Sequence, residues 1–298
     1  MRATGVLTDA AHLGLSDHVC WVYEDPRDFT GPAARWLADG LALGQRLLYV
    51  SGRSEEAMRA DVDPLPDVDR LIGDGTLTLL SLPAVYDLGA PIVPDQQLST
   101  YDVLMRDALS AGHSGLRVLA EVTGLVADPQ RRADHVLWEH LADDYMSRGR
   151  PLAALCAYRR DVIGDDAVGD LTAVHPAVRA CPADSAFRLY FQDGRLTVSG
   201  TVDTFGSRRL AEILAASHAY GNPDRVRPDG LDPVAVLDVS GMEFVDARGA
   251  TTLAEFAGRV RARGVDLEVV GATALLRRVW AALRLDRVSG IPLAVERS

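Results

Sequence analysis

Two histidines and two cysteines are the side chains of the N-terminal half that could do the most chemistry. His18 and Cys20 lie two apart in an apolar stretch, so on a strand both would project to one face. Cys156 and His175 could join them from the far end of that half, and two cysteines with two histidines can hold zinc tetrahedrally. No compact Cys-x-x-Cys or His-x-x-x-His pair occurs, however, and a cysteine in an apolar strand is usually a small buried hydrophobe. The sequence therefore favours core packing of these cysteines over a metal site. A ligand or redox pocket formed by some of the four residues is an alternative that the sequence does not decide.

Glu121 is a carboxylate inside the apolar stretch 116–122. A carboxylate in a strand that is covered on both faces must form an ion pair, accept hydrogen bonds or remain in contact with water. It could form a structural pair with Arg117 or Arg159. Alternatively, it could lie at the carboxyl edge of the sheet, where open α/β folds bind ligands. In that case the crevice would be bordered by Tyr23, Tyr158 and Arg159. With Cys20 and Trp21 added, such a crevice suits a small, partly apolar ligand.

Strands and helices that alternate along the first 160 residues must position these groups. Short apolar runs predict strands over 18–23, 45–50, 76–82, 115–122 and 152–158. Apolar residues at helical spacing predict helices over 29–43, 101–111 and 133–147. This alternation is typical of a parallel sheet covered on both faces. The proline-rich stretch 83–98 is expected to be a loop, and 161–185, which mixes Asp, Gly and Pro, a linker.

A second α/β unit follows the linker. Strands are expected over 187–192, 195–203 and 267–270, with helices over 207–220 and after 275. Between them, 234–239 reads as a strand covered on both faces, and Ser240-Gly241 punctuates it. Asp246 can then cap an amphipathic helix.

Order and spacing over residues 185–298 resemble a STAS domain, the module of anti-sigma-factor antagonists and of sulfate-transporter tails. The family pattern is a strand, then Asp-Ser-Ser-Gly or similar, then a helix; the corresponding residues here are Asp246, Ala247, Arg248 and Gly249. In antagonists switched by phosphorylation, the residue after the Asp is the serine that takes the phosphate, and Ala247 has no hydroxyl. The resemblance implies that these four residues contact a partner, an anti-sigma factor of the histidine-kinase-like ATPase type.

Residues 10–180 resemble a MEDS domain, the sensory module named for methanogens, methylotrophs and a dichloromethane-responsive regulator. The resemblance rests on short motifs: His18-x-Cys20, Gly40-Leu41-x-x-Gly44-Gln45, Glu121, Trp138-Glu139, Cys156-x-Tyr158 and His175-Pro176. It implies a small-molecule sensor, and the candidate ligand or sensor residues are His18, Cys20, Tyr23, Glu121, Cys156, Tyr158 and His175. The family is thought to be related to RecA-like ATPases, which implies a three-layer α/β fold.

The nucleotide loop of such an ATPase is degenerate here. A phosphate loop needs glycines and a lysine directly after the first strand. Residues 24–31 hold one glycine and three acidic residues, and the chain contains no lysine. Nucleotide hydrolysis is therefore disfavoured. The remaining histidines carry no pattern: His12, His113, His135, His140 and His218. No nucleophile–base–acid arrangement is visible, so we expect no enzyme and no cofactor, with a nucleotide-binding or enzymatic use of the crevice as the alternative.

Length and composition set the remaining limits. A chain of 298 residues with 48% hydrophobic residues is long enough for two cores. A net charge of −11 without a dense basic cluster disfavours direct nucleic-acid binding. No apolar run spans a bilayer and no signal peptide is recognisable, so we expect a cytoplasmic protein that does not bind membranes. We predict a signalling regulator in which the sensory domain rather than phosphorylation governs partner switching by the STAS domain, and a homodimer is one oligomeric state that the sequence leaves open.

Overall fold

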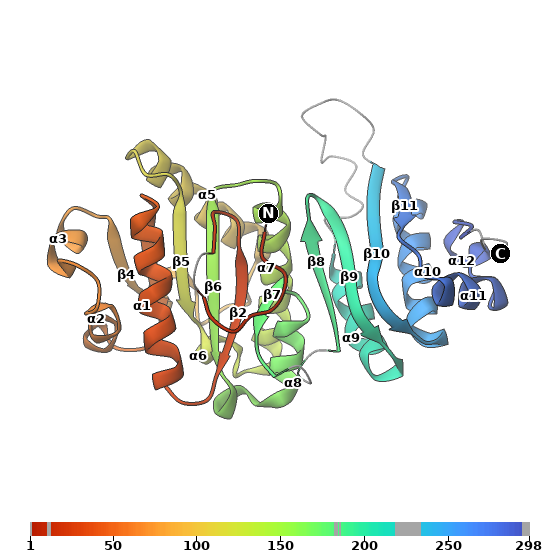
Figure 1. The fold of residues 1–298 in the computed structure, drawn as a ribbon, viewed down its shortest axis with the longest axis horizontal. Coiled ribbons are helices and arrows are strands. Elements are labelled where there is room, and N and C mark those ends of the chain that lie inside the picture. Colours follow the sequence, from red (N-terminus) through yellow and green to blue (C-terminus); the bar gives the residue numbers. More distant parts are fainter. Residues whose placement is uncertain (1, 11–12, 182–183, 185, 218–233, 294–298) are drawn as a thin grey trace. The chain divides into compact units, whose positions relative to one another are not determined.

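The computed structural model describes residues 2–10, 13–181, 184, 186–217 and 234–293. The chain divides into two compact units, Met1–Asp184 and Ser185–Ser298 (Figure 1). Each unit has its own sheet and helices, so the α/β prediction is confirmed for both. His12, His218 and the end of the expected helix over 207–220 lie outside the described residues.

The N-terminal unit is built on a seven-stranded sheet in which every neighbouring pair is parallel. Its order is β1-β7-β2-β6-β5-β3-β4. The strands are β1 (Gly5–Val6), β2 (His18–Tyr23), β3 (Arg46–Ser51), β4 (Leu77–Ser81), β5 (Leu116–Glu121), β6 (Leu152–Arg159) and β7 (Ala177–Arg179). Every residue of β2 and β5 is buried, as expected for central strands covered on both faces.

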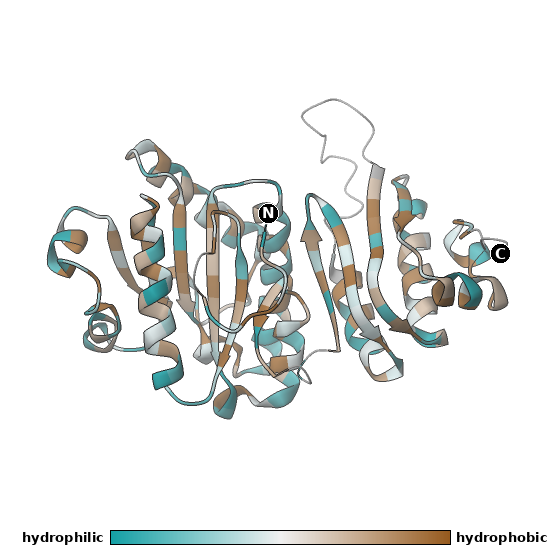
Figure 2. Ribbon diagram, in the orientation of Figure 1, coloured by the Kyte–Doolittle hydropathy of each residue, from teal (hydrophilic) through white to brown (hydrophobic). Residues whose placement is uncertain are grey.

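Helices cover both faces of this sheet. They are α1 (Arg27–Ala42), α2 (Glu55–Val62), α3 (Val68–Gly73), α4 (Leu82–Val85), α5 (Pro94–Ser110), α6 (Thr123–Val126), α7 (Pro129–Ser147) and α8 (Arg160–Thr172). Helices α1 and α2 pack on the face to which Val19, Trp21 and Tyr23 point, and they form one hydrophobic core with it. Helices α7 and α8 contact each other, and α7 packs on the face that carries His18 and Cys156. Figure 2 shows hydrophobic residues running along the strands between these helices.

Two stretches that were expected to be irregular are helical. The expected linker 161–185 contains most of α8 and all of β7, and the expected loop 83–98 contains most of α4 and the start of α5. The linker prediction failed because α8 is broken at Gly164, whose φ of 77° interrupts the apolar period of the helix. Beyond the break, Val168 and Leu171 are fully buried, so packing rather than composition decides the structure there.

The C-terminal unit is a mixed four-stranded sheet in the order β11-β10-β9-β8. Its elements are β8 (Phe187–Gln192), β9 (Arg195–Val202), α9 (Thr204–Ala216), β10 (Val234–Val245), α10 (Ala247–Ala262), β11 (Asp266–Val270), α11 (Ala274–Ala282) and α12 (Asp286–Ser289). Strands β8 and β9 form an antiparallel hairpin, and Asp193 and Gly194 at its turn have φ of 50° and 74°. The other strand pairs are parallel.

The expected turn at Ser240-Gly241 is absent because β10 continues through it to Val245. The pairing of β10 with β9 shifts register between Asp238 and Gly241 instead, so the two residues mark an irregularity inside the strand. A side chain at Gly241 would come within 2.9 Å of Ser199 Cβ, which explains why a glycine lies there. The expectation that this strand is covered on both faces also needs correction: Leu237 and Val239 are buried, while Val236 is only partly buried.

A fully buried arginine fixes α1 against the sheet of the N-terminal unit. The Arg117 guanidinium donates to Gln45 Oε1 at 2.6 Å, to the Trp36 carbonyl at 3.1 Å and to the Leu13 carbonyl at 2.7 Å. It also lies 4.0 Å from the centroid of the Trp36 ring. Gly40 of α1 leaves the space for this side chain, because a Cβ there would lie 2.4 Å from Arg117 Cδ.

Two glycines of α1 therefore respond oppositely to alanine. We expect Gly40→Ala to lower the free energy of unfolding by about 1–3 kcal/mol, since the hydrogen-bonded Arg117 cannot move aside. Gly31→Ala, at an exposed position with nothing within 4 Å of the new Cβ, is the matched control and should raise it by about 0.5–1 kcal/mol. Urea denaturation of both variants measures the difference. Equal effects of the two substitutions would contradict this account of α1.

Candidate functional site

The connection from β2 to α1 is too short to enclose a triphosphate. Only residues 24–26 separate the strand from the helix, and Pro26 at the helix start provides no side-chain cap. Asp25 in this connection is held by Arg27 at 2.6 Å. A phosphate loop needs several successive backbone N–H groups around the anion, and three residues that include a proline cannot supply them.

Glu121 lies at the carboxyl end of β5 and is held by hydroxyl groups rather than by an arginine. Its carboxylate accepts hydrogen bonds from Tyr23 at 3.0 Å, from Ser51 at 3.3 Å and from the Thr123 hydroxyl. Burial, followed by the charge of Glu121, raises the pKa of Tyr23. The alternative of a structural pair with Arg117 or Arg159 is wrong. Arg117 is bound to Gln45 and two carbonyls, and Arg159 pairs with Asp161 at 2.7 Å. Glu121 thus ties together the ends of β2, β3 and β5.

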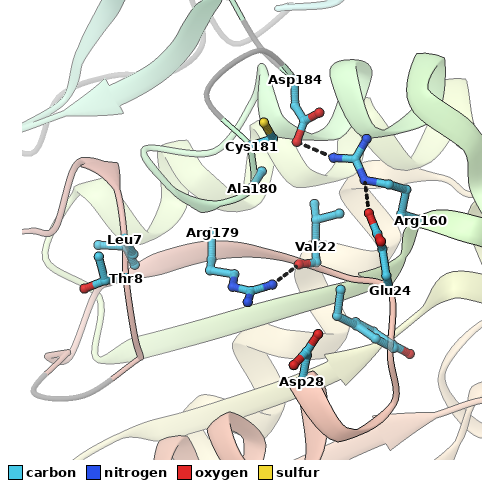
Figure 3. Close-up of a pocket in the computed structure, with 11 residues that line it drawn as sticks. Leu7, Thr8, Val22, Glu24, Asp28, Arg160, Arg179, Ala180, Cys181 and Asp184 are labelled. Carbon is cyan, nitrogen blue, oxygen red and sulfur yellow. Dashed lines mark hydrogen bonds and ion pairs between the residues drawn. The ribbon is translucent and has the colours of Figure 1, made fainter.

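A cavity of about 610 Å³ opens beside this edge, at the carboxyl ends of β2 and β7 (Figure 3). Arg160 lies at one side of it, paired with Asp184 and, at 3.4 Å, with Glu24. Arg179 points toward β2 and donates to the Val22 carbonyl at 2.9 Å. The other residues that line the cavity are Leu7, Thr8, Tyr23, Asp28, Ala180 and Cys181. The lining thus combines two guanidinium groups with three carboxylates, those of Glu24, Asp28 and Asp184, and a few apolar side chains. This mixture suits a small polar ligand that both donates and accepts hydrogen bonds.

A second polar group is buried on the opposite face of the sheet, under α7. His18 Nε2 lies 2.9 Å from Glu139 Oε2, and the Cys156 thiol donates to the same oxygen at 3.5 Å. His175 Nε2 is 3.5 Å from that oxygen as well. We call these four residues the buried cluster. One ligand atom from each lies within 4.8 Å of the others, so the four could hold a metal ion together.

The electrostatics of the buried cluster centre on Glu139. Burial alone would raise the pKa of Glu139, but the charge of His135 and contacts from three histidines outweigh it, so its pKa lies well below the usual value. Burial lowers the pKa of His18, yet its hydrogen bonds to Asp143 and Glu139 dominate and raise it. A buried carboxylate is thus stabilised by partners that surround it.

A further layer of hydrogen bonds orients these side chains. Glu139 Oε1 accepts from Tyr158 at 2.8 Å and lies 2.8 Å from His135 Nε2. His18 Nδ1 faces Asp143 Oδ1 at 3.3 Å, and Arg2 pairs with that same oxygen at 2.5 Å. His175 Nδ1 faces the carbonyl of Leu171 at the end of α8, 2.8 Å away.

The structure divides the residues that the sequence singled out into two places. Tyr23 and Glu121 meet at the carboxyl edge of the sheet on the face of α1, and Tyr23 also lines the cavity. Tyr158 points to the other face, so the single crevice expected to hold both tyrosines is wrong. The remaining four lie on that other face: His18, Cys20, Cys156 and His175. Cys20 is buried opposite Cys156 across β2 and β6. From the sequence, Cys20 was the fourth potential metal ligand, but in the structure the fourth ligand atom near His18, Cys156 and His175 belongs to Glu139.

The Trp138-Glu139 pair is one of the motifs of the MEDS resemblance, but sequence reasoning did not name Glu139, or any other residue of α7, as a site residue. His135, Glu139 and Asp143 follow one another at intervals of four, so they form a polar stripe along one helix face. All three are buried. A repeated i, i+4 spacing of ionisable residues on the inner face of an amphipathic helix was the signal that could have found them.

In the C-terminal unit, the two helices α9 and α10 begin side by side with aspartate caps. Asp203 accepts from the Gly206 N–H and Asp246 from the Gly249 N–H, each at 2.8 Å. The Thr204 hydroxyl donates to Asp246 at 2.6 Å and links the two helix starts. Ala247 and Arg248 are exposed there, while Gly249 is buried with Val202 only 2.7 Å from where its Cβ would lie.

The geometry defines a two-unit chain: a parallel α/β unit with a buried polar cluster and a β2–α1 connection too short for a phosphate loop, followed by a small mixed α/β unit. A family model described as the MEthanogen/methylotroph, DcmR Sensory domain (MEDS) matches residues 17–176. Because this match covers more than half of the chain, the chain belongs to the MEDS family. A second model, described as the Mlab, STAS domain, matches residues 185–293, so the predicted fusion of the two domains is confirmed. No curated protein matches the chain. A sensory domain joined to a STAS domain makes this a signalling or regulatory protein.

The cap of α10 predicts a pH-dependent contribution to stability. Burial raises the pKa of Asp246, but hydrogen bonds from Gly249 and Thr204 outweigh it, so its pKa lies below the usual value. A lowered pKa stabilises the fold above about pH 4, and this contribution is lost as the pH falls through the folded-state pKa. We expect Asp246→Ala to cost about 1 kcal/mol at neutral pH.

Asp246→Asn separates the charge of the cap from its hydrogen bonds. This variant keeps an oxygen for the Gly249 N–H but not the carboxylate, so its difference from the wild type should shrink below about pH 4. Urea denaturation at several pH values measures it. Glu255→Gln, which removes an exposed carboxylate from the same helix, serves as the control. A difference that stays constant down to low pH would contradict the assignment.

Proposed function

We propose that this protein is a signalling regulator that works by partner switching without phosphorylation. The N-terminal unit takes up a small molecule, and the helix start at Asp246, Ala247, Arg248 and Gly249 contacts an anti-sigma factor of the histidine-kinase-like ATPase type. The observation that carries the proposal is Ala247: it lies exposed at the start of α10, where a phosphate would lie against the partner, yet it has no hydroxyl. The switch is then conformational.

Exposed aromatic side chains beside this helix start support a contact surface. Phe205, in the first turn of α9, is 91% exposed, and Phe244, near the end of β10, is 45% exposed. The hydrogen bond from Thr204 to Asp246 keeps the start of α9 next to that of α10. Aromatic residues contribute most of the binding energy in many protein interfaces, and such exposure is costly unless a partner covers it.

Neighbouring hydroxyls are poor substitutes for the missing serine. Thr251 donates its hydroxyl to the Ala247 carbonyl at 2.8 Å, and Thr252 is buried. Ser240 is exposed but belongs to β10 rather than to the helix start. The Thr251 hydroxyl is thus engaged with the helix backbone and Thr252 is covered, so neither presents a hydroxyl at the exposed position of Ala247.

The cavity at the ends of β2 and β7 is our candidate for the sensory pocket. Its three carboxylates, Glu24, Asp28 and Asp184, would repel a triphosphate, and the adjoining connection over 24–26 cannot wrap phosphates, so the cavity supports uptake of a small molecule rather than a nucleotide. We therefore propose a non-enzymatic role for the crevice and do not favour the nucleotide-binding alternative. None of the helices in the described ranges combines the length and the hydrophobicity that a bilayer crossing requires.

Phosphorylation tests the proposal directly. The wild-type chain, incubated with ATP and the anti-sigma-factor kinases of its source organism, should take up no phosphate over 246–252. Ala247→Ser restores the hydroxyl and should become phosphorylated, since its helix start is exposed. Phosphopeptide mass spectrometry reads out both. Phosphate on Thr251 or Thr252 of the wild type would contradict the proposal.

Binding measurements test the surface. We expect Phe205→Ala to weaken binding to the cognate anti-sigma factor about tenfold or more, because an exposed aromatic anchor is lost. Leu283→Ala removes a 45% exposed side chain just after α11 and should change the dissociation constant by less than about twofold. Calorimetry with each purified kinase measures both. Equal losses for the two variants would place the contact elsewhere.

A further inference from the structure

We propose that His18, Glu139, Cys156 and His175 bind one zinc ion in the N-terminal unit. The four side chains supply two imidazole nitrogens, one thiolate sulfur and one carboxylate oxygen, which are the ligand types that zinc takes in proteins. All four are buried. The inference goes beyond the signalling proposal and does not depend on it.

The distances suit a four-coordinate ion. Ligand atoms around tetrahedral zinc lie roughly 3.3–3.8 Å apart. Cys156 Sγ is 3.7 Å from His18 Nε2 and 3.5 Å from Glu139 Oε2. His175 Nε2 is 3.5 Å from that oxygen. The 2.9 Å between His18 Nε2 and Glu139 Oε2 is shorter and needs a few tenths of an ångström of opening. The two remaining separations, from His175 to His18 and to Cys156, are within 4.8 Å, so the ion would draw the His175 ring inward by up to about 1 Å.

One nitrogen of the buried cluster points to a ligand independently. His175 Nε2 is fully buried and has no hydrogen-bond partner among the residues that the structure describes. Leaving a buried ring nitrogen unsatisfied costs roughly 1–3 kcal/mol. Its lone pair is directed into the cluster, because the opposite nitrogen, Nδ1, faces the Leu171 carbonyl at 2.8 Å. A metal ion bound at Nε2 removes this cost.

The outer contacts are those that metal-binding histidines require. A ligating histidine usually donates its other N–H to a carboxylate or a backbone carbonyl, which fixes the ring and its tautomer. His18 Nδ1 faces Asp143 at 3.3 Å and His175 Nδ1 faces Leu171 O. Tyr158 and His135 hold the other oxygen of Glu139, so Oε2 is left to the centre.

Charge and donor chemistry select the ion. The Cys156 thiolate and the Glu139 carboxylate together neutralise a divalent cation. Binding releases the thiol proton and the proton that His18 Nε2 donates to Glu139, both to solvent. Mg²⁺ and Ca²⁺ prefer sets of oxygen ligands and do not suit sulfur and imidazole. Zn²⁺ accepts sulfur, nitrogen and oxygen in one tetrahedron, and Co²⁺ can replace it as a spectroscopic probe.

A zinc ion here would join separate parts of the unit. Its ligands come from β2, from β6, from the middle of α7 and from the segment between α8 and β7. The ion would therefore clamp both helices onto one face of the sheet, and its binding free energy would add to the stability of the fold.

Metal analysis of the full chain tests the site. The protein, purified without a metal-affinity tag, should carry about one zinc per chain by inductively coupled plasma mass spectrometry. Cys156→Ser and His175→Ala should each lose most of that zinc. Cys20→Ser is the matched control, because Cys20 is equally buried on the neighbouring strand but is not one of the four ligands, and it should retain the full equivalent.

Substituting Co²⁺ for zinc in the wild-type chain tests the site even if one of the ligand variants fails to fold. Wild-type chain stripped of metal and loaded with Co²⁺ should show a thiolate-to-cobalt charge-transfer band and tetrahedral ligand-field bands, and Cys20→Ser should show both. A wild type that binds neither ion stoichiometrically would overturn the proposal. The proposal would also be overturned if Cys156→Ser retained zinc while Cys20→Ser lost it. A cobalt spectrum of the wild type without a thiolate-to-cobalt band would likewise overturn it.

Discussion

The N-terminal unit depends on one buried negative charge, the Glu139 carboxylate between the sheet and α7. A carboxylate removed from water on all sides is tolerated only where partners replace the water. Those partners come from three elements: His18 from β2, His135 from the same helix, and Tyr158 from β6. Because each partner must be held at hydrogen-bond distance, the position of α7 is fixed relative to the sheet.

The sequence was sufficient for the central strands of the N-terminal sheet, but it was insufficient for the short strands β1 and β7 and for several helices. The central strand 18–23 was predicted with its observed bounds, because six successive buried residues leave a clear apolar run. Helices α2 and α3 were missed, since they are short and only a few of their residues are buried. Helix α8 was mistaken for a linker because Asp and Gly dominate its first half and the break at Gly164 splits its pattern. Tertiary packing decides such segments, and a local pattern cannot contain that information.

The same limit explains which site residues could be found. His18, Cys156 and His175 stood out as unusual residue types in apolar surroundings, but their shared centre is Glu139, an ordinary glutamate in a helix rich in charged residues. Only the packing of α7 against β2 and β6 distinguishes it from a solvated side chain. In the C-terminal unit, by contrast, the site could be predicted from neighbouring residues alone. The helix start at Asp246 is a local feature, and its cap hydrogen bond to Gly249 followed directly from the sequence.

The break in α8 has a mechanical consequence for this fold. Arg160 opens the helix at the rim of the cavity, and Leu171 closes it beside the ring of His175. A rigid rod would carry any tilt at the rim straight into the protein interior. Gly164, with a φ of 77° that other residues adopt only under strain, divides the helix into two segments instead. The two segments are held by different contacts: the ion pairs of Arg160 at the rim, and the buried side chains of Val168 and Leu171 in the interior.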